Sequence, residues 1–216
     1  PPGVCPEAWC LANPDAVDAR LEVTYLLPAG TRVVKPHRAP AGERVTIWVD
    51  LEDARLADTA VSTIVRSVDG VPVVVERAMW WPGPTPGAWH EAHAAAGATT
   101  TSSRWVIADG EVDASRGVET YILVANTSDA PADVRVTLLF EDGSRAERTF
   151  PGVAARSRFN VPVGYRFPEA SGRRFGAVVE GVGGAPASLV VERAIYWDAT
   201  GQHWAAGGSA LAARVP

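Results

Sequence analysis

The chain has 216 residues, of which 47% are hydrophobic and 21% charged, a composition typical of globular proteins and sufficient for two hydrophobic cores. Its formal net charge of -5 creates a field that repels nucleic acid and anionic lipid, so we expect neither as a partner. The sequence contains no run of about 18 apolar residues, so we expect no membrane insertion.

Two cysteines, Cys5 and Cys10, lie near the start of the chain and frame Pro6. In one continuous extended strand they would be too far apart to bond, so a disulfide requires a turn, which Pro6 allows. We favour a disulfide, which would indicate an oxidising compartment. Free thiols and a two-cysteine metal site are the alternatives, although no His or second Cys pair lies nearby.

Strand patterns dominate the rest of the chain, and turn residues separate them. The clearest hairpin begins with the alternating segment 133–138 and turns at Glu141-Asp142-Gly143 into the segment 144–150. The other expected strands cover residues 21–27, 31–35, 45–50, 61–67, 71–80, 159–163, 175–180 and 187–197. Only two short segments, 51–57 and 90–96, are candidates for helices.

One segment of the chain occurs twice: residues 74–81, VVERAMWW, return as residues 190–197, VVERAIYW. The similarity extends to Leu11-Ala12-Asn13, which matches Val124-Ala125-Asn126, and to the turns that end at Gly30 and Gly143. This period is too long for a solenoid unit and is typical of two complete small domains in series. We therefore expect one module at residues 1–103 and another at residues 104–216, both cut from a longer array.

Six or seven short strands in each module, joined by turns, indicate an all-β fold of two tandem antiparallel β-sandwich modules. Four features carry a resemblance: Ala-Asn after the first strand, the turn glycine, a lone arginine before the fourth strand, and Val-Glu-Arg-Ala followed by aromatic residues. With these features the chain resembles the tandem immunoglobulin-like modules of large secreted bacterial proteins. The resemblance implies a role in stalks, adhesion or surface display, and no catalysis.

Each copy of the Val-Glu-Arg-Ala motif sets a glutamate beside an arginine, as Glu76-Arg77 and Glu192-Arg193. Adjacent residues of a strand point to opposite faces, so these neighbours cannot pair with each other. The arginines share their face with apolar residues, so we expect Arg77 and Arg193 at the edge of the core, paired or stacked on Trp. Exposure through a bulge and ligand binding are the alternatives.

One asparagine follows the first strand of each module: Asn13 in the first and Asn126 in the second. A turn-capping role accounts for both of them. Asn126-Thr127-Ser128 also fits a glycosylation acceptor pattern, whereas Asn13 precedes Pro14.

Five of the eight tryptophans gather toward the ends of the modules. They are Trp80, Trp81, Trp89, Trp197 and Trp204. We expect packing in the cores or between modules, and the alternative is an exposed row of rings that stacks on sugars of a surface glycan.

We expect no metal or cofactor. His90-Glu91-Ala92-His93 spaces its histidines at i and i+3, whereas a helical zinc motif needs i and i+4. Asp109, Glu111 and Asp113 alternate at the expected module junction as calcium ligands do, but they lack a closing bidentate Glu, so a solvated linker is favoured. The sequence has no nucleophile elbow, phosphate loop or dinucleotide fingerprint.

These features together predict a non-enzymatic protein, extracellular or on the cell surface, that acts as a structural spacer or adhesive segment. Its expected partners are other modules or copies of the same protein. A carbohydrate-binding module that uses exposed tryptophans is the alternative.

Overall fold

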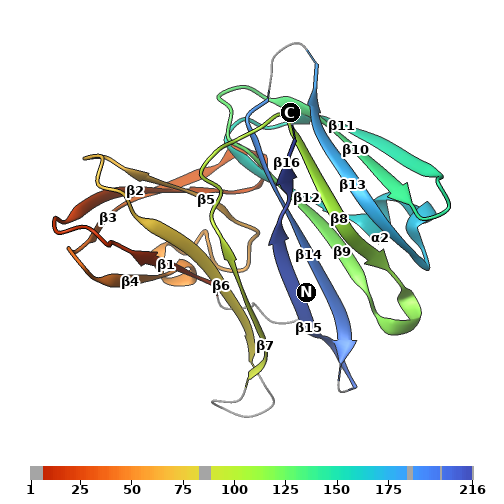
Figure 1. Ribbon diagram of the computed structural model, residues 1–216, viewed down its shortest axis with the longest axis horizontal. Coiled ribbons are helices and arrows are strands. Elements are labelled where there is room, and N and C mark those ends of the chain that lie inside the picture. The colour runs from red at the N-terminus through yellow and green to blue at the C-terminus, as the bar shows by residue number, and fades with distance from the viewer. Residues whose placement is uncertain (1–6, 83–88, 184–186, 200, 216) are drawn as a thin grey trace. The chain divides into compact units, whose positions relative to one another are not determined.

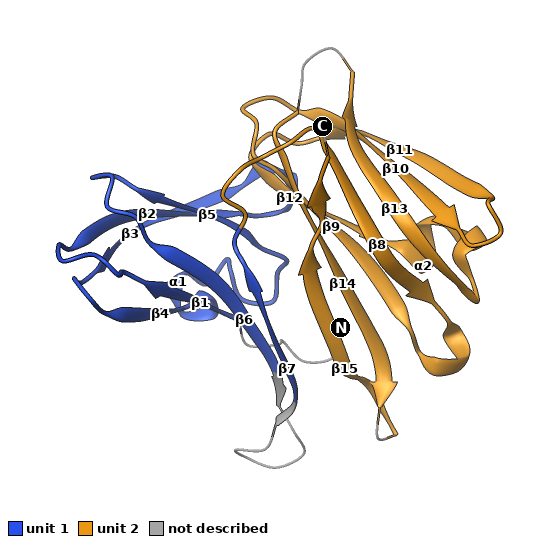
Figure 2. Ribbon diagram, in the orientation of Figure 1, with its two compact units in different colours: residues 1–97 blue, residues 98–216 orange. Residues whose placement is uncertain are grey.

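The computed structural model describes residues 7–82, 89–183, 187–199 and 201–215. The fold consists of antiparallel sheets (Figure 1), which confirms the predicted all-β sandwich class. The chain divides into two compact units, residues 1–97 and residues 98–216 (Figure 2). The division falls a few residues before the boundary expected after residue 103, and Ser102 is already bridged to Leu189 of the second unit.

Unit 1 contains two sheets, with strand orders β4-β1-β6-β7 and β3-β2-β5. Its strands are β1 (Glu7–Ala12), β2 (Ala19–Leu26), β3 (Arg32–Ala39), β4 (Arg44–Trp48), β5 (Ser62–Ser67), β6 (Val74–Pro82) and β7 (Trp89–Ala96). A 3-10 turn, η1 (Pro28–Gly30), joins β2 to β3, and one helical turn, α1 (Val49–Glu52), follows β4.

Unit 2 contains two larger sheets, with strand orders β11-β10-β13-β8-β16 and β12-β9-β14-β15. Its strands are β8 (Arg104–Val112), β9 (Glu119–Asn126), β10 (Ala132–Phe140), β11 (Arg145–Val153), β12 (Ser157–Pro162), β13 (Arg173–Val182), β14 (Leu189–Ala199), β15 (Gln202–Leu211) and β16 (Ala213–Arg214). Short helical turns lie at η2 (Ala114–Arg116), α2 (Val163–Arg166) and η3 (Pro168–Ala170).

The β10–β11 hairpin shows how the sequence pattern produces these sheets. Val134, Val136 and Leu138 are fully buried, while the residues between them are partly exposed, because successive side chains of a strand point to opposite faces. The turn closes where Gly143 adopts a φ of +81°, a conformation that glycine reaches without steric cost. Antiparallel alternation of this kind predicts one buried and one solvated face for each sheet.

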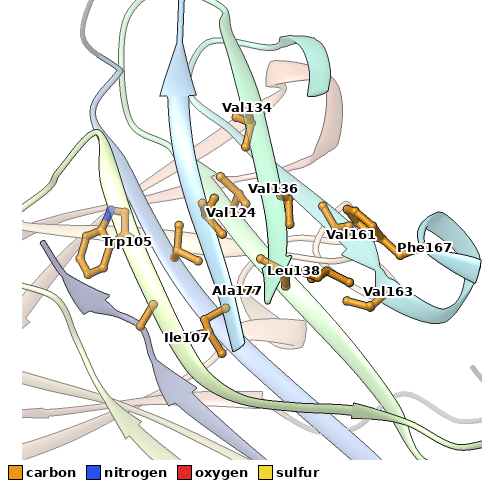
Figure 3. Close-up of a cluster of buried hydrophobic side chains, with 14 of the residues drawn as sticks. Trp105, Ile107, Val124, Val134, Val136, Leu138, Val161, Val163, Phe167 and Ala177 are labelled. Atoms are coloured by element: carbon orange, nitrogen blue, oxygen red, sulfur yellow. The ribbon is translucent and has the colours of Figure 1, made fainter. Parts of the chain in front are cut away.

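Each unit has its own hydrophobic core between its two sheets. In unit 2 buried side chains come from every strand from β8 to β14, and Phe167 lies in the cluster beside α2 (Figure 3). In unit 1 the core is centred on Leu11, Val23 and Tyr25, which are completely buried. Among the described residues no helix is long and apolar enough to cross a membrane.

Three expectations about local structure were wrong. The Ala-rich segment 90–96 is not helical but belongs to β7, which pairs with β6 from Glu76 to Pro82. The helix expected at residues 51–57 is reduced to the single turn α1, which ends at Glu52. The acids expected in a solvated linker, Asp109 and Glu111, lie instead on strand β8, whose Trp105 and Ile107 face the core of unit 2.

Candidate functional site

The acidic residues expected at a module junction lie on β8 and at its end, where they contact arginines. Arg193 on β14 donates to Asp109 through Nη1, 2.5 Å from Oδ2. Its side chain is only 14% exposed, whereas that of Asp109 is 76% exposed. The arginine therefore extends from the edge of the core to a carboxylate in solvent.

Two further arginines form ion pairs with the other two acidic residues, Glu111 and Asp113. Arg116 of η2 pairs with Glu111, and its Nε lies 2.9 Å from Asp113 Oδ2. Arg174 of β13 lies 3.5 Å from Glu111. Asp113 also caps η2 by accepting from the Ser115 backbone amide. The Ser115 hydroxyl and Arg116 hold the pKa of Asp113 at about 2, well below its ordinary value.

These groups surround a surface hollow of about 770 Å³ in unit 2. Its lining consists of Asp109, Glu111, Ser115, Arg116, Val118, Arg174, Arg193, Ile195, Trp197, Asp198 and Gly208. Three arginines face three carboxylates, so the hollow has little net charge of its own. Trp197 supplies an aromatic surface and is 38% exposed.

The chemistry available in the hollow is binding by hydrogen bonds and stacking. Ser115 donates its hydroxyl to Asp113 Oδ1 at 2.6 Å, in a local turn and without a basic partner that could activate it. Asp198 accepts from the Trp204 amide at 3.0 Å and contacts His203 Nδ1 at 2.9 Å. Among the described residues no three His, Cys, Asp or Glu side chains form a group that could hold a metal ion.

Gly117 determines where Asp198 can lie. It ends η2 with a φ of +62°, and a Cβ at this position would lie 2.2 Å from Asp198 Cγ. The carboxylate therefore packs directly on the backbone of the turn between β8 and β9. The sequence did not indicate Arg116, Arg174, Ser115 or Asp198 as site residues. For Ser115 and Arg116 the available signal was the Asp-x-Ser-Arg-Gly turn at residues 113–117.

The arginine of the first motif has a different partner. Arg77 on β6 is buried, and its Nε lies 3.8 Å from Glu7 Oε1 on β1, whose side chain is 14% exposed. The neighbours Glu76 and Glu192 point away from the arginines, Glu76 exposed and Glu192 partly buried. The two motif arginines thus contact carboxylates from different strands.

The two asparagines occupy matching turns. Asn126 is completely buried, and its Nδ2 donates to the carbonyls of Ala130, Val153 and Ala154 within 3.1 Å. Its Oδ1 accepts from the Ser128 amide at 3.0 Å.

Asn13 makes the equivalent contacts in unit 1. It donates to the carbonyls of Val17 and Ala39, both at 2.9 Å, and accepts from the Asp15 amide at 3.0 Å. The amide therefore joins the loop after the first strand to the end of another strand in each unit.

Two of the candidate ligand-binding tryptophans, Trp197 and Trp204, lie on opposite faces of the β14–β15 pair. Trp204 stacks on Tyr196 at 5.6 Å and on His203 at 4.7 Å, and it meets Tyr121 edge-on at 5.9 Å. Trp197 lines the hollow on the other face with Ile195. The two indoles therefore form no common planar row.

Of the three candidate tryptophans in unit 1, the structure describes the side chain of Trp80. Trp80 is partly buried and meets Trp48 edge-on at 5.3 Å. The backbones of Trp81 and Trp89 lie in β6 and β7, and their side chains are outside the described part of the structure.

Cys10 is a free thiol on β1, and Arg44 Nη2 lies 2.9 Å from its Sγ. Residues 8–12 form continuous ladders with both β4 and β6, so the strand makes no turn here. The structure therefore has the free-thiol alternative at Cys10 in place of the favoured disulfide. Cys5 lies outside the described residues.

Near the aromatic cluster, β9 contributes a carboxyl group in a half-buried position. Glu119 accepts from the Gly164 amide at 2.8 Å. Burial raises the pKa of Glu119 above its ordinary value, while the bond from Gly164 opposes the shift. Burial, together with the charge of Glu119, also raises the pKa of Tyr121.

Comparison with known proteins adds little to this description. No protein-family model matches the chain, and no curated protein matches it at a significant level. A solved structure titled "Crystal Structure of Thermotoga maritima 1070" is similar to part of the chain, with 15% identity and a TM-score of 0.44. The similarity covers 52% of this chain and 93% of that one. A likeness of this size says nothing about function.

Proposed function

We propose that the chain is a non-enzymatic structural or adhesive segment of a bacterial surface or secreted protein, built from two immunoglobulin-like modules in tandem. Its location is extracellular, and its partners are other modules or copies of the same protein. A segment of this kind sets distance and stiffness between other parts of a protein, because each module keeps a core of its own.

The observation that supports this proposal is the matching arrangement of strands in the two units. The order β4-β1-β6-β7 corresponds to β12-β9-β14-β15, and β3-β2-β5 corresponds to β11-β10-β13. Asn13 and Asn126 close the same loop, and Arg77 and Arg193 occupy the same motif. Features that recur in both units are scaffold features.

Single-molecule pulling of the full chain tests the mechanical part of the proposal. We expect two separate unfolding events, each releasing on the order of 300 Å of chain at about 3.6 Å per extended residue. One combined event would contradict independent modules. The location is tested with antibodies against the chain on intact and lysed source cells, and labelling that requires lysis would contradict surface display.

A second candidate, carbohydrate binding, is favoured by one observation: Trp197 presents an exposed ring in a hollow that also offers arginines and carboxylates. An exposed indole stacks on a sugar ring, and the charged groups can bond to its hydroxyls. We expect any glycan binding detected on an array to be lost in Trp197→Ala. The matched control is Trp48→Ala, which removes a ring that is 46% exposed in unit 1.

A further inference from the structure

The helical turn that follows β4 in unit 1 and β12 in unit 2 ends in opposite charges. The third residue of the turn is Leu51 in α1 and Tyr165 in α2, and both are exposed, at 82% and 77%. The fourth residue is Glu52 in α1 and Arg166 in α2. The two units therefore share an exposed large side chain at this turn but differ in the charge beside it.

The partner of the charged residue also differs between the units. In unit 1, Glu52 lies 2.8 Å from Nε2 of His37 on β3, and both side chains are largely buried. Phe150 of β11 holds the position in unit 2 that matches His37. The Arg166 guanidinium carbon lies 5.8 Å from the centre of the Phe150 ring. Unit 2 therefore replaces a polar pair with a cation on an aromatic ring.

A second ring also contacts the Arg166 guanidinium, whose carbon lies 5.3 Å from the centre of the Tyr165 ring. Within the described part of the chain, this arginine contacts the rings of Phe150 and Tyr165 and pairs with no carboxylate. Contact with a ring face orients a guanidinium but uses none of its N–H groups as hydrogen-bond donors. The donors of Arg166 are therefore available.

Arg148 lies on the same group of rings and shows the contrast. Its guanidinium carbon lies 5.4 Å from the centre of the Phe167 ring, which meets the Phe150 ring edge-on at 6.5 Å. Arg148 also donates to Glu169 Oε1 at 2.6 Å. The charge of Arg148 is thus balanced within the unit, whereas the charge of Arg166 is available to a ligand.

The chemistry of this turn matches a carboxylate attached to a sugar. A guanidinium fork binds a carboxylate through two parallel hydrogen bonds. The exposed Tyr165 beside the fork offers an aromatic face and a hydroxyl, which are groups that contact sugars in binding sites. The formal net charge of -5 repels a long polyanion, so the matching ligand carries a single acidic group.

We propose that Arg166 and Tyr165 form a binding site for a glycan that ends in an acidic sugar. The sugar carboxylate bonds to the Arg166 fork, and the rest of the glycan lies against Tyr165. The site shares no lining residue with the hollow around Trp197, so binding here persists in Trp197→Ala, unlike binding at the second candidate site. This inference rests on the adhesive role proposed above and names the class of ligand for it.

The test titrates the full chain with methyl glucuronide and with methyl glucoside, in which a hydroxymethyl group replaces the carboxylate. Nuclear magnetic resonance follows the side-chain N–H of Arg166 and the ring of Tyr165. We expect saturable shifts with the glucuronide. The glucoside should bind at least about tenfold more weakly, because it leaves the guanidinium without an anion.

Variants at the turn assign the binding to particular residues. Arg166→Gln should weaken glucuronide binding at least about tenfold, and Arg166→Lys should also weaken it because an ammonium lacks the planar fork. Tyr165→Ser should weaken it less. The matched control combines Arg148→Gln with Glu169→Gln, which removes a balanced pair from the same rings and should leave the affinity unchanged. Tyr165 and Arg166 are exposed, so their variants should keep the melting temperature of the parent.

Four results of the titrations would overturn the proposal. They are an absence of saturable binding, equal binding of the glucoside, undiminished binding in Arg166→Gln, and loss of binding in Trp197→Ala, which would assign the glycan to the hollow. Tighter binding of a glutamate-containing peptide than of the glucuronide would also overturn it, because the arginine would then serve a protein partner. None of these results would alter the two unfolding events expected of independent modules, so this inference and the structural proposal fail separately.

Discussion

Glu7 of β1 and Thr120 of β9 hold equivalent positions in their sheets, opposite Met79 and Ile195, but they have different partners. Thr120 is completely buried and bonds through its hydroxyl to both the amide and the carbonyl of Glu111 on β8. Glu7 instead places a carboxylate beside Arg77. The polar contact that β8 supplies to unit 2 is thus replaced in unit 1 by an ion pair within a single sheet.

This difference predicts unequal costs for removing the two motif arginines. Arg77→Ala leaves the largely buried Glu7 carboxylate without its cation and should lower the free energy of unfolding of unit 1 by about 2 to 3 kcal/mol. Arg193→Ala leaves only the solvated Asp109 and should cost unit 2 about 1 kcal/mol. Calorimetry that resolves the two units measures both values. Equal losses would contradict the proposed origin of the difference.

Removal of the buried amide should destabilise unit 2 more than an ordinary surface change. Asn126→Ala removes the donor to three carbonyls and the acceptor for the Ser128 amide, so we expect a loss of about 2 to 3 kcal/mol. Asn126→Asp is the matched control, because it keeps the acceptor and loses the donor, and it should also destabilise the unit. Urea unfolding gives both values. An unchanged midpoint in Asn126→Ala would contradict a stabilising role for the Asn126 side-chain amide.

Glu119 should make unit 2 less stable as pH rises. Its pKa in the folded state lies above the ordinary value of 4.5, so the folded state holds the proton more tightly than the unfolded state does. Stability from this group is present below the unfolded pKa and is lost as pH rises through the folded pKa. Glu119→Gln keeps an acceptor for Gly164 and should remove this loss. Melting temperatures from pH 4 to pH 7 check the sign, and a variant less stable than the parent at pH 7 would contradict it.

Gly117→Ala should cost more than an equally strained glycine substitution elsewhere. Gly117 and Gly143 both have positive φ, but a Cβ at Gly143 meets nothing within 4 Å, whereas one at Gly117 collides with Asp198. We expect Gly143→Ala to cost about 1 kcal/mol from backbone strain alone, and Gly117→Ala roughly twice as much. The His203 resonance should also shift in Gly117→Ala as Asp198 moves. Equal losses of stability in Gly117→Ala and Gly143→Ala would show that the Asp198 carboxylate can move away from residue 117 at no cost.

The sequence predicted strands where apolar residues alternate and a turn residue follows. Val134, Val136 and Leu138 before Gly143 are the clearest case, and the β10–β11 hairpin has the expected position. The prediction missed β15 because of Gly207 and Gly208, which are unfavourable in a strand. In the structure the Tyr196 ring packs directly on the backbone of Gly207. A Cβ at residue 207 would lie 2.7 Å from Tyr196 Cδ1, so only glycine leaves room for the ring.

The candidate site was less predictable, because its partners are distant in sequence. Asp109 and Glu111 alternate as metal ligands can, but β8 carries them to Arg193 and Arg174, and both arginines are many residues further along the chain. The sequence favoured a solvated linker for these acids, whereas in the structure they contact arginines. Likewise, Arg77 and Arg193 share a motif, but the identity of their carboxylates depends on whether a strand like β8 is present.

The burial of Asn126 has a consequence for production of the protein in eukaryotic secretory hosts. Asn126-Thr127-Ser128 is an acceptor sequon, and oligosaccharyltransferase would act on it before the chain folds. A sugar on Nδ2 would occupy the atom that bonds to Ala130, Val153 and Ala154 in a site with no exposed surface. Modified chains should therefore be retained as misfolded material, and secreted native protein should carry an unmodified asparagine at this position.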